Sequence, residues 1–437
     1  MRWLFLTSLT IILIGYAFLD RAFAYVGVAP LYIGEVVLAI AVVWLLTAWR
    51  RIPRDPLHFI LLAFMALGAL RTLPYLEHDG LDALRDAVLW GYGLFALALS
   101  AAIDKRHISG AVSVFRRVIP FFLLWVPLAV PLSALLDDTL PTVGANSIDV
   151  LTVKAGDAGV HLAGVGAFMI TGLFATHGAK RIFEALLTVL WVVSIGIVGA
   201  LNRGGLLAAS VAGSALLLRP SKGWLLGLPL VALFSILIAL SNPVVEVPGR
   251  RTLSLSQIQD NVVSIFTDTG ERRQEGTKDF RLQWWGKIVD YTVWGPYFLS
   301  GKGFGVNLAE DDGVVQGVNN PLPLRSPHNS NMTVLARMGV PGMGLWIALQ
   351  LGFGASLIAA FFRARKAGAT FWSRVDLWLF AYWLAAIVNS MFDVYLEGPQ
   401  GGIWFWAIFG LGLAAMRLQA DIGKTRPSLV PSLGRNS

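Results

Sequence analysis

Three side chains that can bind or deprotonate a substrate stand at the edges of long apolar runs in this sequence. Arg203 lies in Asn-Arg-Gly-Gly, Arg281 precedes a pair of tryptophans, and His328 lies in Pro-His-Asn-Ser. Arginine binds phosphate oxygens in pairs through its planar, permanently charged group. Histidine has a pKa near neutrality and can accept a proton from a hydroxyl group. These residue types indicate an anion site with a candidate general base, provided that the fold brings them together.

Arg203 is the only charged residue between Glu184 and Arg219. A charge among apolar spans costs roughly 2.5–3.5 kcal/mol at mid-membrane on insertion scales, so such a residue usually pairs, snorkels or functions. Gly204 and Gly205 follow it and let the backbone come close to a ligand. A helix that starts here points free amide groups outward and forms an anion site. The alternative is an arginine that snorkels from a tight turn.

Arg281 is expected on a helix that lies on the outer surface of the membrane. Spacings of three and four residues place Trp284, Trp285 and Ile288 on the same face, so this arginine points toward the protein or the bilayer. Stacking on the tryptophans is the alternative to ligand binding. The stretch 254–268 is also amphipathic. Together the two helices predict a lid over the outer surface.

His328 is expected at the start of a helix. A loop ends at Pro327, and the polar side chains of His328, Asn329 and Ser330 can cap the helix that follows. Gly339, together with a Pro-Gly pair just after it, is expected to break this helix before the membrane span continues. The imidazole then lies at a helix N-terminus at the membrane surface. The alternative is a histidine in a solvated loop.

The composition predicts that membrane helices position these residues. The chain is 56% hydrophobic and 14% charged, whereas soluble proteins have roughly 25% charged residues. A helix that crosses a bilayer needs ~20 mainly apolar residues. Twelve stretches meet this need, approximately 3–19, 31–48, 57–73, 84–103, 118–136, 159–176, 182–201, 206–218, 224–241, 332–361, 375–391 and 402–416. We therefore expect an all-α, polytopic membrane protein with about 12 transmembrane helices.

The distribution of Lys and Arg predicts the orientation, because these residues concentrate in cytoplasmic loops. Alternate short segments between the spans hold most of them, which predicts that both termini are cytoplasmic and that the long loop is outside. Residues 1–241 then carry nine spans, 242–330 form a periplasmic loop with amphipathic helices, 331–416 carry three spans, and 417–437 form a disordered cytoplasmic tail. The candidate site residues share the outer face.

Other charged residues on the outer side are further candidates. Arg85 adds a third cation to the anion pocket, or instead pairs with Asp82 or Asp86. Asp393 and Glu397, between the last two spans, either bind substrate or serve the structure. Each of these alternatives stays open at the level of sequence.

Neither a cofactor nor a nucleic acid is expected. The chain has no cysteine, which excludes disulfides, thiol chemistry and cysteine-based zinc sites. The outer acidic run from Glu310 to Asp312 is the pattern of a solvated loop, so no metal is expected. Nucleic-acid binding needs basic residues on one soluble face, whereas here they form short clusters between apolar runs. The lipid bilayer is the expected surrounding.

In their order and spacing, these segments resemble the O-antigen ligase and polymerase family, membrane enzymes that join undecaprenyl-diphosphate-linked glycans to acceptors. The resemblance rests on Asn-Arg-Gly-Gly-Leu-Leu at 202–207, Arg281 ahead of Trp285, Gly-Lys-Gly-Phe-Gly at 301–305, and Pro-His-Asn-Ser at 327–330 leading into Gly-Val-Pro-Gly. It covers roughly residues 180–410.

The resemblance implies a GT-C-like membrane glycosyltransferase in the bacterial cytoplasmic (inner) membrane, with a periplasmic active site. Family arginines that hold the diphosphate match Arg203 and Arg281, the essential histidine matches His328, and the late acidic residue matches Asp393. The remaining expected substrate contacts are Gly204, Gly205, Arg85, Asn329 and Trp285. An acceptor hydroxyl, on a lipid A core or a growing glycan, then attacks with inversion while the histidine removes its proton.

Three functions stay open. An O-antigen ligase-like enzyme is favoured, because one large outer loop follows the ninth span. A polymerase of O-antigen or exopolysaccharide repeat units uses the same residues. A flippase of lipid-linked oligosaccharides is a further alternative, although it predicts symmetric halves and ionisable groups at mid-membrane. The oligomeric state is not predicted.

Overall fold

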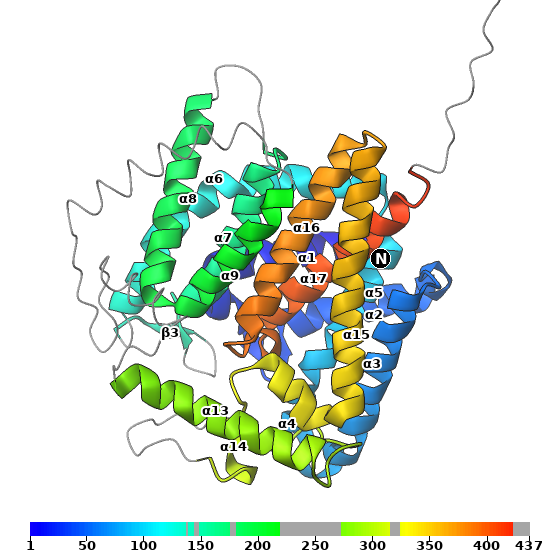
Figure 1. Ribbon diagram of the computed structural model, residues 1–437, viewed down its shortest axis with the longest axis vertical. Helices are drawn as coiled ribbons and strands as arrows, with labels where there is room; N and C mark the ends of the chain where they lie inside the picture. Colours follow the sequence, from blue (N-terminus) through cyan, green and yellow to red (C-terminus); the bar gives the residue numbers. More distant parts are fainter. Residues whose placement is uncertain (137–138, 144–147, 175–180, 219–271, 315–323, 423–437) are drawn as a thin grey trace, which may run out of the picture.

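The computed structural model of this chain folds almost entirely into helices (Figure 1). It describes residues 1–136, 139–143, 148–174, 181–218, 272–314 and 324–422. Within these residues, eight helical segments are long and apolar enough to cross a membrane, and three shorter apolar helices accompany them. The expected all-α, polytopic membrane protein is confirmed.

The helices follow the predicted apolar stretches closely. The first half supplies α1 (Arg2–Ala24), α2 (Ile33–Ala48), η1 (Trp49–Arg51), α3 (Pro56–Thr72), η2 (Leu73–Tyr75), α4 (Leu76–Gly91), α5 (Gly93–Ala102), α6 (Lys105–Leu135), α7 (Ala155–Ile170), α8 (Arg181–Leu201), α9 (Arg203–Ala215) and η3 (Leu216–Leu218). The second supplies α13 (Arg272–Val293), α14 (Leu308–Asp311), α15 (Ser330–Lys366), α16 (Thr370–Ser390), η4 (Tyr395–Glu397) and α17 (Pro399–Leu418). Each predicted span overlaps a helix except 224–241, which lies outside the described residues.

The strands in the described part of the chain form two short antiparallel hairpins. β1 (Gly27–Val28) pairs with β2 (Leu31–Tyr32), and β3 (Thr142–Val143) pairs with β4 (Ile148–Asp149). Both hairpins connect helices, α1 to α2 and α6 to α7. They leave the helical architecture unchanged.

α16 and α17 form the centre of the bundle. In each, 72% of the most apolar window is buried, against 22% in α8 at the edge (Figure 1). α16 contacts α7 and α9 on one side and α15 on the other. A Cβ atom at Gly156, in the first turn of α7, would lie 3.2 Å from Asn389 Oδ1 and 3.3 Å from Asn202 Nδ2. The starts of α7 and α9 therefore meet the end of α16.

The predicted break at Gly339 is confirmed. Gly339 has φ +65° inside α15, where the chain leaves helical geometry. A Cβ atom here would lie 2.4 Å from Phe298 O, so only glycine fits this close approach of two backbones. Two further helices bend in the same way, α4 at Gly80 and α1 at Asp20, each with φ +46°. The short first segment of α15 carries the residues after His328.

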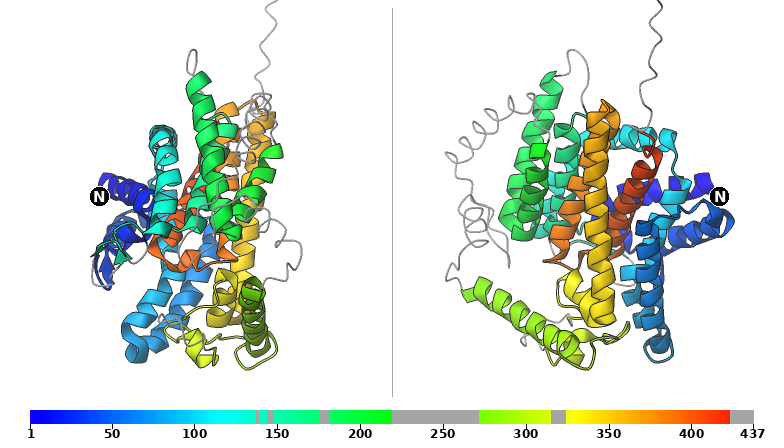
Figure 2. Two further views of the ribbon diagram at one scale, coloured as in Figure 1. Left: turned by 90° about the vertical axis from the view of Figure 1, so that its left-hand side faces the viewer. Right: turned by 45° about the vertical axis from the view of Figure 1, so that its right-hand side comes forward.

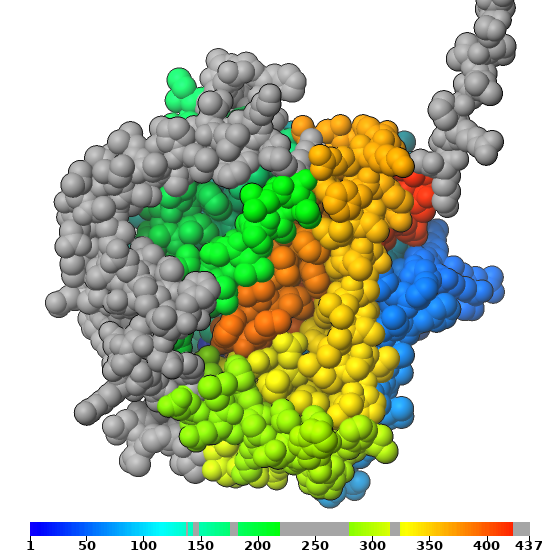
Figure 3. Space-filling model, viewed as in Figure 1, coloured from blue at the N-terminus to red at the C-terminus, as the bar shows by residue number. Residues whose placement is uncertain are grey.

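α13 crosses the lower end of the bundle and contacts α15 (Figure 2). Its predicted inner face is confirmed, because Trp284 and Ile288 are buried while Arg281 and Trp285 are half-buried. In the space-filling view α13 lies directly against the start of α15 (Figure 3). The second predicted surface helix, 254–268, lies outside the described residues.

Candidate active site

His328 is fixed from both sides in an unusual backbone conformation. Its φ of +52° lies in the left-handed region, which residues other than glycine rarely adopt. Before it, Trp285 Nε1 donates a hydrogen bond of 2.9 Å to Pro327 O. After it, Asn329 caps α15, its Oδ1 accepting from Asn331 N at 3.0 Å and Met332 N at 3.3 Å. The expected position at a helix start is confirmed, and α13 supplies the contact that holds the loop.

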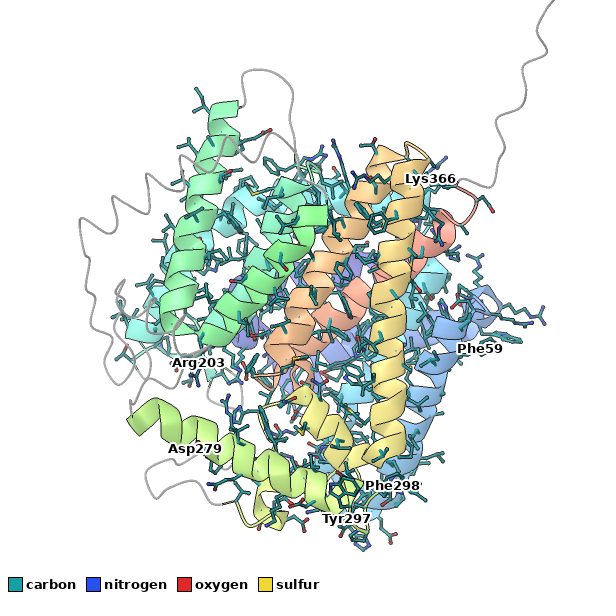
Figure 4. The ribbon with its side chains drawn as sticks, in the orientation of Figure 1. Phe59, Arg203, Asp279, Tyr297, Phe298 and Lys366 are labelled. Carbon is teal, nitrogen blue, oxygen red and sulfur yellow. The ribbon has the colours of Figure 1, made fainter. Side chains whose placement is uncertain are left out.

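Arg203 is the first residue of α9. Asn202 caps the helix, its Oδ1 accepting from Gly205 N at 2.8 Å. Gly204 and Gly205 are both buried, and a Cβ atom at Gly204 would lie 3.3 Å from the Cβ of Phe392. In the structure the two glycines let α9 pack against its neighbours, and a ligand contact of their own stays a prediction. The view with side chains shows Arg203 at the end of α9 that faces α13 (Figure 4).

Arg281 reaches from α13 to the segment after α16. Its Nη1 donates a hydrogen bond of 3.2 Å to Phe392 O, and the same Phe392 packs on Gly204. Burial lowers the pKa of Arg281, Asp393 raises it, and the positive charge of Arg203 lowers it further. Because Phe392 contacts both Arg281 and Gly204, the residue after Arg203, the structure brings the two arginines near each other. Among the described residues, no carboxylate oxygen lies within 4.0 Å of a guanidinium nitrogen of either arginine, which is the distance limit for an ion pair.

Asp393 lies beside this pair of arginines and is held by a lysine. Lys154 Nζ lies 3.0 Å from Asp393 Oδ2 and 3.2 Å from Oδ1, and Val394 N donates to Oδ1 at 2.8 Å. Burial works against the charged carboxylate, but Lys154 brings the pKa of Asp393 below its ordinary value. Sequence reasoning missed Lys154. The sequence feature that could have identified it is a lone cation directly before an apolar helix, on the predicted outer side.

The electrostatic surroundings keep His328 neutral. Burial lowers its pKa to about 4, and the positive charges of Arg281 and Lys154 act in the same direction, while Asp393 opposes them. A neutral imidazole at neutral pH is the form that can accept a proton. The half-buried histidine, the two arginines and the Lys154–Asp393 pair form the candidate site.

Arg85 is placed apart from these contacts. Its exposed guanidinium lies 3.8 Å from Asp82 Oδ1, the pairing considered as an alternative. Asp86 is instead bound by Arg325 at 2.9 Å and by Arg337 at 2.9 Å. Substrate binding by Arg85 stays a prediction.

The glycine-rich run at 301–305 supports the helix that follows His328. Lys302 N donates to Ala336 O at 2.7 Å, and Gly303 N donates to Arg337 O at 3.0 Å. Arg337, 1% exposed, returns a hydrogen bond of 3.1 Å to Gly303 O. This pairing explains why the glycine-rich run and the motif around His328 occur together in the sequence, because the run supports the helix that follows His328.

The remaining polar candidates have structural partners. Lys302 Nζ lies 2.5 Å from carboxylate oxygens of both Asp311 and Asp312, so two of the three carboxylates in this acidic run bind a lysine. Glu397 is held by Thr333 Oγ1 at 2.8 Å.

Comparison with known proteins bears on this site. Residues 188–347 match a family model described as O-Antigen ligase. The matched segment includes Arg203, Arg281 and His328, whereas Lys154 and Asp393 lie outside it. No curated protein matches the chain. The match, together with the helical membrane architecture, supports assignment of this chain to the O-antigen ligase and polymerase family.

Proposed function

We propose that the protein is an O-antigen ligase-like glycosyltransferase of the bacterial inner membrane. It transfers a glycan from an undecaprenyl-diphosphate donor to a sugar hydroxyl of an acceptor at the periplasmic face. The observation that carries this proposal is the pair of neighbouring arginines without carboxylate partners among the described residues, beside a histidine kept neutral. Such a group suits a diphosphate leaving group and a hydroxyl nucleophile.

The arginines act on the leaving group. As the bond between the anomeric carbon and the diphosphate oxygen breaks, negative charge grows on that oxygen. Arg203 and Arg281 hold the diphosphate, and the amide groups at the start of α9 add positive potential. Fixed donors aimed at developing charge stabilise a transition state by about 2.7–4 kcal/mol each in measured cases.

His328 acts on the acceptor. One ring nitrogen of His328 takes the proton of the acceptor hydroxyl while the hydroxyl oxygen forms the new bond to the anomeric carbon. The undecaprenyl diphosphate leaves from the opposite side, so the anomeric configuration is inverted. General base catalysis of this kind contributes about 10²–10⁴ in rate. Asp393 is assigned to the acceptor side, because a carboxylate can accept a hydrogen bond from a sugar hydroxyl.

The same chemistry needs no metal in this proposal. Divalent ions commonly neutralise a diphosphate, and here two guanidinium groups take that place. Protein treated with a chelator is therefore expected to keep its transfer activity. Loss of activity that returns with added magnesium would contradict this part of the proposal.

The acceptor separates a ligase from a polymerase. A ligase moves finished chains to a lipid A core, so cells without the protein accumulate long lipid-linked chains. A polymerase joins repeat units, so cells without it accumulate single lipid-linked units. We propose the ligase, and mass analysis of the accumulated glycolipid tests that choice.

Transfer by purified protein in liposomes tests the reaction itself. Donor and acceptor are supplied, and the glycosylated acceptor and released undecaprenyl diphosphate are measured together. Arg281→Lys is expected to reduce transfer by about tenfold or more, because a point charge does not reproduce the paired hydrogen bonds of a guanidinium. Arg106→Lys, an exposed arginine in α6, is the matched control. Unchanged transfer by Arg281→Lys would contradict the clamp.

A further inference from the structure

Lys154 is a cation of the site that the proposed mechanism does not use. It lies directly before the first turn of α7, and its backbone N donates a hydrogen bond of 2.7 Å to Asp20 Oδ2 at the bend of α1. Its side chain ends on the carboxylate of Asp393, at 3.0 and 3.2 Å. The two side chains are 26% and 19% exposed, so water screens this pair only in part. The lysine is thus fixed at its backbone and at its ammonium group.

Asp393, the partner of Lys154, is the neighbour in sequence of Phe392, whose carbonyl oxygen Arg281 contacts. Phe392 O accepts from Arg281 Nη1 at 3.2 Å, and Asp393 follows directly in the chain. Among the charges that act on the pKa of Arg281, that of Asp393 is the strongest. The guanidinium nevertheless has no carboxylate within ion-pair distance in the described part of the chain. The carboxylate nearest in sequence to its contact is bound to Lys154 instead.

We infer that Lys154 is a positioning residue, which holds the Asp393 carboxylate at the end of α16 and thereby leaves Arg281 unpaired for a diphosphate. This inference rests on the proposed function. With Lys154 and Asp393 cancelling each other, two arginine charges face the ligand. Without Lys154, the carboxylate turns to Arg281 and cancels one of them. Asp157 and Arg21 also act on Lys154, although Asp157 makes no ion pair with it among the described residues.

The test is the affinity of the purified protein for undecaprenyl diphosphate, compared with undecaprenol. Lys154→Met is expected to weaken binding of the diphosphate about tenfold, the size of one charge-assisted hydrogen bond. Lys154→Arg keeps the cation and is expected to bind as the wild type does. Lys105→Met removes an exposed lysine at the start of α6 and is the matched control for loss of one charge.

The double variant Lys154→Met/Asp393→Asn decides the matter. It removes the lysine and the carboxylate together, so Arg281 stays unpaired, and affinity is expected to return to within about threefold of wild type. Affinity as weak as that of Lys154→Met alone would overturn the inference, because it would make Lys154 a direct ligand of the diphosphate. Wild-type affinity in Lys154→Met would overturn it as well.

Asp393→Asn alone gives a reading that does not depend on the stability of Lys154→Met. It leaves Arg281 unpaired and is expected to bind undecaprenyl diphosphate at least as tightly as wild type does. Weaker binding would contradict the inference. If wild-type protein does not prefer the diphosphate over undecaprenol, the proposed function itself fails. If it does prefer it, and Arg281→Met loses that preference, only the role of Lys154 is in question.

Discussion

At the scale of single residues, the backbone conformation of His328 and the charges around it fix its position and its protonation state. Its left-handed conformation costs of order 1–3 kcal/mol and persists only when the surroundings hold it. Trp285 from α13 and the cap formed by Asn329 provide that hold. The order of residues around Pro327 was enough to predict a helix start. It could not reveal the left-handed backbone, because one of the two contacts that hold it comes from Trp285 on a separate helix.

The pKa of His328 leads to a prediction about pH. A pKa of about 4 means that the imidazole stays neutral, and able to accept a proton, down to that pH. In the free protein, kcat/KM for the donor is therefore expected to be flat through neutral pH and to fall as pH drops through about 4, instead of near the ordinary value of about 6.5. The bound diphosphate is negative and favours the imidazolium, so the acid limb of kcat lies at higher pH than that of kcat/KM. The pH dependence of initial transfer rates measures both limbs, and an acid limb of kcat/KM near 6.5 would contradict the described surroundings.

Lys154 shows what residue types and spacing alone could not reveal. The three predicted site residues stand in local patterns, whereas Lys154 and Asp393 are 239 positions apart in sequence. Only the packing of α7 against α16 brings them together. The same holds for Asp86 and Arg337, which are distant in sequence although Arg337 Nη2 lies 2.9 Å from Asp86 Oδ2. Long-range charge pairs depend on tertiary contacts that no local period encodes.

At the scale of elements, the start of α15 and the run at 301–305 form one unit. Backbone hydrogen bonds join Lys302 to Ala336 and Gly303 to Arg337, at 2.7 and 3.0 Å. The predicted break at Gly339 followed from glycine and proline chemistry and is confirmed. The reason for the break is tertiary: Val340 N donates to Phe298 O at 2.8 Å, which requires the chain to turn there.

Gly339→Ala tests this unit. The backbone of Gly339 (φ +65°, ψ −167°) lies in a region essentially confined to glycine, so alanine costs of order 1–3 kcal/mol there, and its Cβ would meet Phe298 O at 2.4 Å. We expect a melting temperature in detergent lower by several degrees and a loss of transfer activity, because the helix after His328 shifts. Gly344→Ala, in the same helix with open space at its Cβ position, is the control and is expected to be tolerated. Equal melting temperatures for the two variants would contradict the close approach seen at Gly339.

At the scale of the whole molecule, eight helical segments of the described residues are long and apolar enough to cross a membrane, and α13 lies at one end of the bundle (Figure 1). Twelve apolar stretches were predicted from composition, and eleven of them coincide with helices in the described residues. Which end faces the periplasm is a prediction from the distribution of Lys and Arg. The orientation decides whether the site meets periplasmic acceptors.

Cysteine labelling tests the orientation cleanly, because the chain has no cysteine of its own. Leu282 is 49% exposed on α13, and Ala367 is exposed at the opposite end of α15. We expect Leu282→Cys to react with a membrane-impermeant thiol reagent in intact spheroplasts, and Ala367→Cys to react only after the membrane is opened. The reverse pattern would place the site in the cytoplasm and contradict the proposed acceptors.

The most direct test of the proposed function is single-turnover glycan transfer by His328→Asn in liposomes. Asparagine tolerates the left-handed backbone and removes the base without disturbing the loop. We predict that this variant binds the undecaprenyl-diphosphate donor as wild type does, while transfer to the acceptor falls by about 10²–10⁴. The control His78→Asn changes an exposed histidine of α4 and is expected to transfer at the wild-type rate. Transfer by His328→Asn at the wild-type rate would contradict the assignment of His328 as the base.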